Sequence, residues 1–359
     1  MQKGTTLNQR DLAMIRDVAR YKYLTSFQLK RLHFDQRKHR TATKRLTELT
    51  KAGYLSRVFS YPTARDKRIG HPTAVFYWTP PNQKALQRYL EKRNMADLWD
   101  DFEILAATNN LTGTLSQQSI EHDYYLSEYS IALETSAART GWRVVFCERL
   151  HPKSMEFRKA AGMTKGTIRV EFREKTEQGM TTRKEDLPVN PDLFYCLLSP
   201  EDIYYFNLHE HERSDKSGTS RFEKKVLGFQ AFARQGYFAR ALSYYIKKYN
   251  LPDTIDPDKT YFRVTTTTHT DNRRNILLKT AVQLNEYRRF LFAAMPDITA
   301  HLTSLEALTA LDAIWIRGTE FKPIEKALEQ LPEETSETIQ YRELHTRVAG
   351  MLRVPLYAN

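Results

Sequence analysis

The sequence has few cysteines and no long apolar run, and each scarcity argues against a class of protein. Cys147 and Cys196 are the only two cysteines in 359 residues, so the sequence predicts neither a disulfide framework nor a cysteine-based zinc site. No apolar stretch approaches the roughly 20 residues that a membrane-spanning helix needs. Residues 1–30 also lack the order of a signal peptide. We therefore expect a cytoplasmic protein whose cysteines are small core residues.

The chain also lacks an internal repeat, a Walker A motif and a Gly-rich dinucleotide loop. These absences argue against a repeat architecture and against the common nucleotide-binding folds. The length is sufficient for two domains that each bury a hydrophobic core.

Positive charge is concentrated at the N-terminal end of the chain. The formal net charge is +12, but residues 1–95 hold 21 Lys and Arg against 6 Asp and Glu, a balance of +15. The remainder holds 34 against 37. A local field of this sign favours a polyanionic partner, most simply DNA. A merely solvated basic surface would not explain why the excess lies in one part of the chain.

The basic segment has the pattern of a winged helix-turn-helix. Three stretches have the apolar spacing or the capping signals of helices, and the third ends at Gly53, a natural helix-terminating residue. Two runs rich in apolar and aromatic residues follow and predict a β-hairpin, the wing. The expected helices are residues 7–21, 25–32 and 40–53, and the expected strands are 54–60 and 74–79.

In this arrangement the third helix would enter the major groove of double-stranded DNA, while the wing would touch phosphate or the minor groove. The alternative is a winged helix that docks a protein and keeps its basic face in solvent. The residues expected to contact DNA are Arg37, Lys38, Arg40, Thr41, Thr43 and Lys44 at the third helix, and Arg65, Lys67 and Arg68 at the tip of the wing.

The rest of the chain predicts an α/β domain with a mixed sheet, because strand-like runs alternate with helical ones around one antiparallel hairpin. We expect a winged-helix domain at 1–95, a linker at 96–118, the mixed-sheet domain at 119–318 and a helical extension at 319–359. The expected helices are 82–93, 121–140, 221–250 and 273–292; the expected strands are 142–148, 261–267 and 313–317; and 167–175 with 180–185 form a charged hairpin.

The stretch from Pro191 to Arg213 is the most informative part of this domain. Two apolar and aromatic runs flank Ser199–Asp202, which has turn chemistry, so the stretch predicts a β-hairpin. A turn centred on Glu201 pairs residues whose numbers sum to 402, which places Asp192 opposite Glu210. Glu212 then lies on the same face as Glu210, because strand side chains alternate.

Three carboxylates gathered at the end of an apolar stripe repel one another and require a cation. Oxygen ligands suit Mg²⁺ or Mn²⁺, the usual metals of phosphodiester hydrolysis, so Asp192, Glu210 and Glu212 are candidate metal ligands. The alternatives are solvated carboxylates at strand ends, or a register slip of one residue that would turn Glu210 to the other face.

Several phrases along the chain resemble the replication-relaxation family of bacterial plasmids and mobile elements. The first is LNQRDLAMIRDVARYKYLT at residues 7–25, within the basic segment. The later matches are His122 and Glu128 on a helix, Pro191–Phe194, the strand Glu210–Arg213, Lys225 with Phe229 on a helix, and the strand 262–266. Together they cover most of residues 7–290.

The resemblance implies a likeness to the MOBC relaxases, whose nuclease domain has the restriction-endonuclease-like PD-(D/E)XK fold. It implies that Asp192 and Glu210 hold the metal, that Glu212 supports it, and that Lys225 stabilises phosphate charge. Lys224 is the alternative to Lys225 for the role of stabilising phosphate charge. Glu212 stands where Asp is more usual, and the strand lacks the usual lysine. His122 and Glu128 would be accessory groups.

The function implied is a metal-dependent endonuclease of a bacterial plasmid or integrative element. It would bind an origin-like site and nick one strand there to begin transfer or replication, with accessory relaxosome or replication proteins as further partners. One alternative is an HUH-like nickase that uses His209 and His211 with Tyr245 or Tyr249 as nucleophile. The other is a non-catalytic DNA-binding initiator or regulator with a degenerate nuclease domain.

Overall fold

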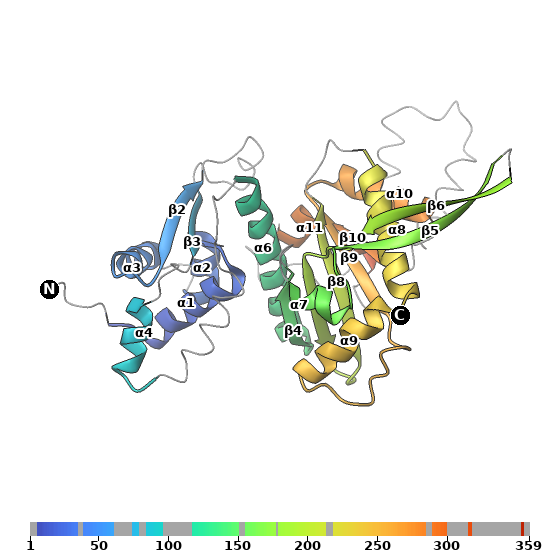
Figure 1. The fold of residues 1–359 in the computed structure, drawn as a ribbon. Helices are drawn as coiled ribbons and strands as arrows, with labels where there is room; N and C mark the ends of the chain where they lie inside the picture. The colour runs from blue at the N-terminus through green and yellow to red at the C-terminus, as the bar shows by residue number, and fades with distance from the viewer. Residues whose placement is uncertain are drawn as a thin grey trace, which may run out of the picture. The chain divides into compact units, whose positions relative to one another are not determined.

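The chain forms two compact units, Met1–Glu128 (unit 1) and Tyr129–Asn359 (unit 2). Figure 1 draws the computed structural model, in which helices combine with a mixed sheet, as expected for the α/β class. No helix in the described part of the chain is long and apolar enough to cross a bilayer. The structure describes residues 6–34, 39–60, 74–78, 84–95, 117–150, 155–176, 179–212, 218–284, 289–299, 315–317 and 353–354.

Unit 1 has the element order of a winged helix. Its three-stranded sheet has the order β1-β3-β2 with antiparallel pairs, and β2 and β3 are the predicted wing strands. Strand β1 was not predicted, because two residues are too short to give a periodic signal. The elements are α1 Gln9–Tyr21, β1 Leu24–Thr25, α2 Ser26–His33, α3 His39–Lys51, β2 Ser56–Ser60, β3 Ala74–Trp78 and α4 Lys84–Glu91.

Local signals in the sequence determine where these helices begin and end. The Thr25 hydroxyl accepts a bond from the Gln28 N–H, and the Gln28 side chain accepts one from the Thr25 N–H, which confirms the predicted capping box of α2. Gly53 follows α3 with φ +80°, a left-handed conformation that favours glycine, as predicted for the end of this helix.

Unit 2 is built on a seven-stranded sheet of order β12-β11-β10-β9-β8-β7-β4. Strands β8, β9 and β10 are parallel, and the flanking pairs are antiparallel. Helix α6, Gln117–Thr140, crosses the boundary between the units. The other elements are β4 Arg143–Arg149, α7 Met155–Ala160, β5 Thr167–Thr176, β6 Gly179–Pro188, β7 Leu193–Leu198, β8 Tyr204–Glu212, α8 Ser220–Arg234, α9 Tyr237–Lys248, β9 Phe262–Thr268, α10 Asp271–Gln283, β10 Phe290–Ala294, α11 Met295–Thr299, β11 Trp315–Arg317 and β12 Arg353–Val354.

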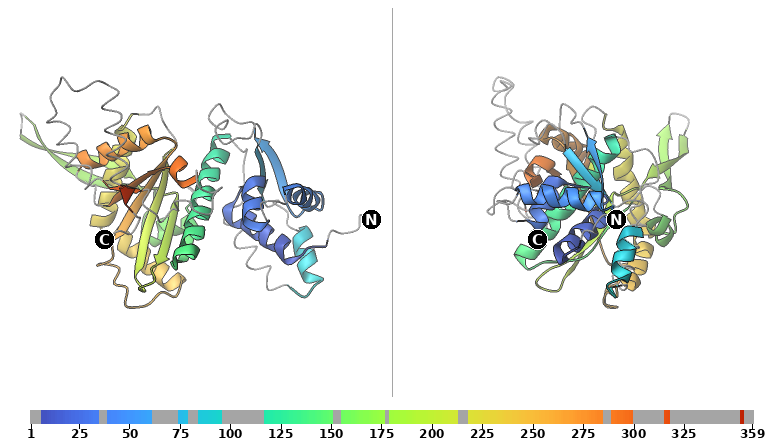
Figure 2. Two further views of the ribbon diagram at one scale, coloured as in Figure 1. Left: turned by 180° about the vertical axis from the view of Figure 1, so that it is seen from behind. Right: turned by 90° about the vertical axis from the view of Figure 1, so that its left-hand side faces the viewer.

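Helices α8, α9 and α10 lie along one face of the sheet (Figures 1 and 2). They connect β8 to β9 and β9 to β10, and right-handed crossovers between parallel strands bring them to the same side. The core on this side is largely aromatic and includes Phe194, Phe206 and Phe232, all 2% exposed or less. On the opposite face Tyr129 of α6 stacks on His209, with ring centroids 3.8 Å apart.

The predicted register of the central hairpin is confirmed. Leu198 pairs with Tyr204, Cys196 with Phe206 and Phe194 with Leu208, so each pair sums to 402. In the turn, the Ser199 hydroxyl accepts bonds from the N–H groups of Glu201 and Ile203. Asp202 adopts φ +60°, which Asp tolerates better than most residues.

Three expectations from the sequence differ from the structure. Residues 221–250, expected to be helical, form two helices, α8 and α9, divided at Gln235 and Gly236. Residues 273–292 were expected to be one helix, but α10 ends at Gln283 and Phe290–Ala294 form β10. All five residues of β10 are buried, and periodicity cannot distinguish a short, fully buried strand from a buried helical segment. Arg353 and Val354, expected within a helical extension, pair with β11 as a strand. Most of the predicted linker and extension lies outside the described residues.

The charged hairpin β5–β6 projects from unit 2 as a two-stranded arm (Figure 1). Cross-strand ion pairs join Arg169 to Asp186 and Lys184 to Glu171. The arm meets α8 where the helix carries Gly228. A Cβ atom at this position would lie 2.4 Å from the Pro188 carbonyl oxygen, so only glycine permits this approach.

We expect Gly228→Ala to lower the free energy of unfolding by about 1–3 kcal/mol, because the added methyl forces the arm and the helix apart. The effect should appear although Ala is the better helix former by about 1 kcal/mol. Urea denaturation followed by the tryptophan fluorescence of unit 2 measures this difference in the free energy of unfolding. The control is Gly218→Ala, where an added Cβ meets no atom within 4 Å. Equal changes in both variants would refute the steric explanation.

Candidate functional site

The outer face of α3 carries the expected DNA-contacting side chains in exposed positions. Arg40, Thr41, Thr43 and Lys44 are all exposed, whereas Ala42, on the predicted apolar stripe, is buried. A largely open hollow of about 610 Å³ lies over this face, lined by Arg40, Thr43, Lys44, Thr47, Glu48 and Lys51. The other expected contacts, Arg37, Lys38, Arg65, Lys67 and Arg68, lie outside the described residues.

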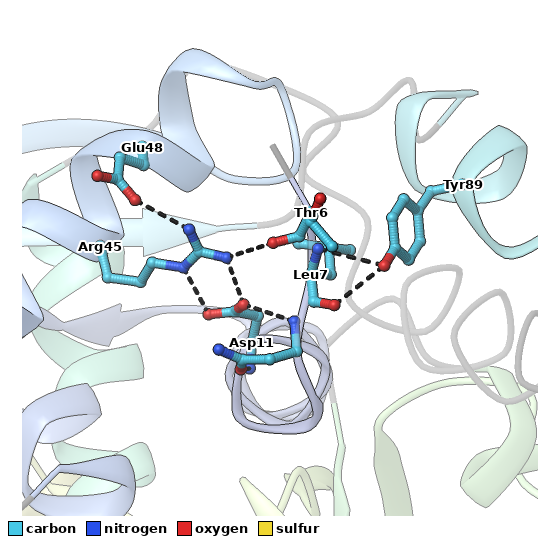
Figure 3. Close-up of polar contacts among 7 residues, drawn as sticks. Thr6, Leu7, Asp11, Arg45, Glu48 and Tyr89 are labelled. Atoms are coloured by element: carbon cyan, nitrogen blue, oxygen red, sulfur yellow. Dashed lines mark hydrogen bonds and ion pairs between the residues drawn. The ribbon is translucent and has the colours of Figure 1, made fainter. Parts of the chain in front are cut away.

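A buried ion pair fixes α3 against the start of α1 (Figure 3). The Arg45 guanidinium donates to both carboxylate oxygens of Asp11, at 2.9 and 2.5 Å, to Glu48 at 2.9 Å and to the Thr6 carbonyl at 2.7 Å. Asp11 has no exposed surface and also accepts the Asn8 N–H. Burial alone raises the pKa of Asp11, but the Arg45 and Asn8 contacts outweigh it and lower this pKa.

Sequence reasoning did not identify Arg45 as a residue that positions α3. The signal was present, because position 45 adjoins the apolar stripe through Leu46 and Leu49, where a basic residue needs a partner. Only the fold reveals that the partner is Asp11, 34 residues earlier in the chain.

We expect Arg45→Met to destabilise unit 1 by about 3 kcal/mol, because it leaves the buried Asp11 carboxylate without its counter-charge. Chemical denaturation measures the loss, and Arg40→Met on the exposed face is the matched control. The folded pKa of Asp11 lies below its unfolded value, so the pair stabilises above about pH 4 and its contribution is lost as pH falls further. Arg45→Met should lack that acid-dependent contribution. If its stability falls below pH 4 as steeply as that of wild type, the Asp11–Arg45 pair is not its source.

The three carboxylates named from the sequence meet at the carboxyl end of β8 in unit 2. Asp192 precedes β7, and its backbone N–H donates to the His209 carbonyl at 2.7 Å, which extends the hairpin pairing. Its side-chain oxygen accepts the His211 N–H, also at 2.7 Å. Glu210 and Glu212 continue the face of Phe206 and Leu208, so they lie at the end of the apolar stripe as predicted.

Lys225 of α8 provides the cation of this cluster. Its ammonium lies 2.5 Å from Glu210 Oε2 and 3.6 Å from Glu212 Oε2. Lys224 points elsewhere and pairs with Glu185 of the arm at 2.6 Å. Phe222 and Val226 are buried on either side of Lys225 along the helix, which explains why this lysine and not its neighbour reaches the sheet.

Glu210 is the buried carboxylate that contacts Lys225 most closely. It is 3% exposed, and burial raises its pKa to about 7, with the charges of Asp192 and Glu212 adding to the rise and Lys225 opposing it. Burial alone lowers the pKa of Lys225, but the charges of the nearby carboxylates, Glu210 first, outweigh it and raise this pKa. Glu210 Oε1 is buried and makes no hydrogen bond, so the cluster retains one acceptor atom with no donor.

The chemistry of this cluster fits a divalent cation, because it offers carboxylate oxygens and one of them lacks a partner. The described residues nevertheless contain no group of three or more His, Cys, Asp or Glu side chains arranged to hold a metal ion. The Lys225 ammonium instead lies among the oxygens. The cluster is therefore a carboxylate–lysine site in the present arrangement.

The two proposed accessory residues have partners in unit 1. Glu128 accepts from the Arg31 guanidinium at 3.3 Å, and His122 Nδ1 lies 3.8 Å from Asp123. The contact between Arg31 and Glu128 joins α2 to α6. The Ser127 hydroxyl donates to the Tyr21 carbonyl, and this bond joins α6 to α1. The role of His122 and Glu128 in catalysis stays a prediction.

The structure does not bring together the residues of the HUH-like alternative. His209 and His211 bond to Thr265 and Thr267 on the face of the sheet opposite Glu210. The nucleophile candidates, Tyr245 and Tyr249, belong to the helical side, and the hydroxyls of both donate to Glu148. Burial, followed by the Glu148 charge, raises the pKa of both phenols, which disfavours the nucleophilic phenolate.

The replication-relaxation family matches residues 15–243, more than half of the chain. This match includes α3 and the whole carboxylate–lysine cluster. No curated protein and no solved structure matches the chain. The likeness to the restriction-endonuclease-like fold therefore stays a prediction from the sequence. By the extent of the match, the chain belongs to the replication-relaxation family, which associates it with replication and mobile elements.

Proposed function

We propose that this protein binds an origin-like DNA site through unit 1 and nicks one strand of it in unit 2. The observation that carries the proposal is the group of charged side chains at the carboxyl end of β8, where Lys225 contacts Glu210 and Glu212 and the charge of Asp192 acts on Glu210. A buried carboxylate such as Glu210, whose pKa is raised to about 7 and which contacts a lysine, marks a candidate site for chemistry. Family membership adds the association with replication.

In the proposed reaction Asp192 and Glu210 would hold Mg²⁺ or Mn²⁺, and Glu212 would support it. A cation held there would supply Lewis-acid chemistry: a more acidic water for in-line attack and a counter-charge for the phosphate. Glu210 Oε1 is the acceptor available to such an ion. Lys225, released from the carboxylates, donates to a phosphate oxygen and stabilises the charge that develops there.

The basic face of α3 accounts for DNA binding in this proposal. Arg40 and Lys44 contact phosphates and determine the position of the helix, while Thr41 and Thr43 reach base edges. The Arg45–Asp11 pair holds that helix in place. The protein would act in the bacterial cytoplasm, and accessory relaxosome or replication proteins would be its further partners.

Relaxation of a supercoiled plasmid that carries the element's own origin region tests the activity. We expect conversion to the open circle only when Mg²⁺ or Mn²⁺ is present, with the break in one strand at one mapped position. A plasmid of the same size without the origin is the control. Failure to nick the origin plasmid with either metal, while the protein still binds it, would reject the nuclease function.

A second function is favoured by one specific observation. The ammonium of Lys225 already neutralises the carboxylates, as expected of a structural ion-pair network. In that case unit 2 is a non-catalytic platform, and the protein is a DNA-binding initiator or regulator. Origin binding without metal-dependent cleavage is the outcome that would select this function.

A further inference from the structure

The contact between Lys225 and the carboxylates has a bearing on metal binding as well as on catalysis. The Lys225 ammonium lies 2.5 Å from Glu210 Oε2 and 3.6 Å from Glu212 Oε2, within the group of oxygens that would bind a cation. An ammonium and a divalent ion a few ångströms apart repel each other strongly at a site as buried as Glu210. Both cannot be held by Glu210 in this arrangement.

We propose that Lys225 is an internal competitor of the divalent metal, which keeps the carboxylate cluster closed to Mg²⁺ or Mn²⁺ until its ammonium is drawn away. The inference rests on the proposed nuclease function and names how its site is regulated. It accounts for Glu210 Oε1, a buried acceptor with no donor while Lys225 occupies the other oxygen.

Withdrawal of the ammonium requires rotation of the lysine side chain and no rearrangement of the helix. Phe222, Val226 and Phe229 anchor α8 in the core, so the backbone at position 225 is fixed. The lysine side chain has four flexible methylene groups, and its ammonium is a point charge that binds phosphate as well as carboxylate. A DNA phosphate at the cluster therefore supplies an alternative partner for Lys225, and metal binding follows DNA binding.

Binding of Mn²⁺ to the full chain without DNA tests this inference, with free Mn²⁺ measured by its paramagnetic resonance signal. We expect Lys225→Met to bind Mn²⁺ at least about tenfold more tightly than wild type, because the competing charge is gone. Lys225→Gln keeps a donor to Glu210 and should show the same direction. Lys224→Met is the matched control, because Lys224 pairs with Glu185 outside the cluster.

Equal Mn²⁺ affinity in wild type and both Lys225 variants would overturn the inference, as would an equal gain in Lys224→Met. Thermal unfolding provides a second readout if Lys225→Met folds poorly. Added Mn²⁺ should then raise the melting temperature of Lys225→Gln more than that of wild type. A similar rise in both proteins would refute the competition.

This experiment separates the inference from the proposed function. Tighter Mn²⁺ binding by the Lys225 variants, with no plasmid nicking by wild type, supports the competition and rejects the nuclease. Metal-dependent nicking by wild type, with unchanged Mn²⁺ affinity in the variants, supports the nuclease and rejects the competition.

Discussion

Asp192→Asn is expected to reduce metal-dependent nicking by about 100-fold or more, a larger loss than outer-shell partners of a metal usually cause. Asn is nearly the same size as Asp and retains an oxygen that can accept the His211 N–H, which Asp192 accepts at 2.7 Å. The substitution therefore removes one negative charge and leaves the hairpin intact. Initial rates of plasmid nicking over a range of Mg²⁺ and Mn²⁺ concentrations measure the effect.

Origin binding by Asp192→Asn should equal that of wild type, because the change lies in unit 2 and the proposed DNA-binding helix lies in unit 1. Asp186→Asn on the arm is the matched control, since it removes the same charge from an exposed ion pair with Arg169. Wild-type nicking by Asp192→Asn would refute the metal site. Equal losses in both variants would point to a general effect of charge.

Replacing both Arg40 and Lys44 by Ala is expected to weaken origin binding and to flatten its dependence on salt. Each phosphate that a cation neutralises contributes about −0.9 to the slope of log affinity against log salt concentration. Loss of two such contacts should reduce the magnitude of that slope by about 1.8. Both side chains are exposed, so the fold should survive the change. Fluorescence anisotropy at several salt concentrations measures the slope.

The control for this pair is Arg88→Ala with Lys92→Ala, which removes two exposed positive charges from the end of α4 in the same unit. The control removes the same number of positive charges as Arg40→Ala/Lys44→Ala but leaves the face of α3 unchanged. An identical slope in wild type and Arg40→Ala/Lys44→Ala would contradict the proposed interface. An equal effect of the control would show that only overall charge matters.

Much of the fold could be predicted because its signals are local. The capping box of Thr25 and Gln28 and the turn from Ser199 to Asp202 are read from neighbouring residues. The turn also determines the register of β7 and β8, and alternation along β8 then places Glu210 and Glu212 on one face. For this reason the carboxylate cluster was recognised before the fold was known.

The sequence by itself therefore determined the α/β class, the hairpin register and the three carboxylates of the cluster. The family resemblance named Lys225 as the fourth side chain, with Lys224 as the alternative. Only the tertiary structure decided that Lys225, not Lys224, reaches them, and that Asp11 is the partner of Arg45. It also made β10 a strand. The physical reason is that these outcomes depend on side chains and strands distant in sequence, whose meeting is set by burial and packing and not by any local pattern.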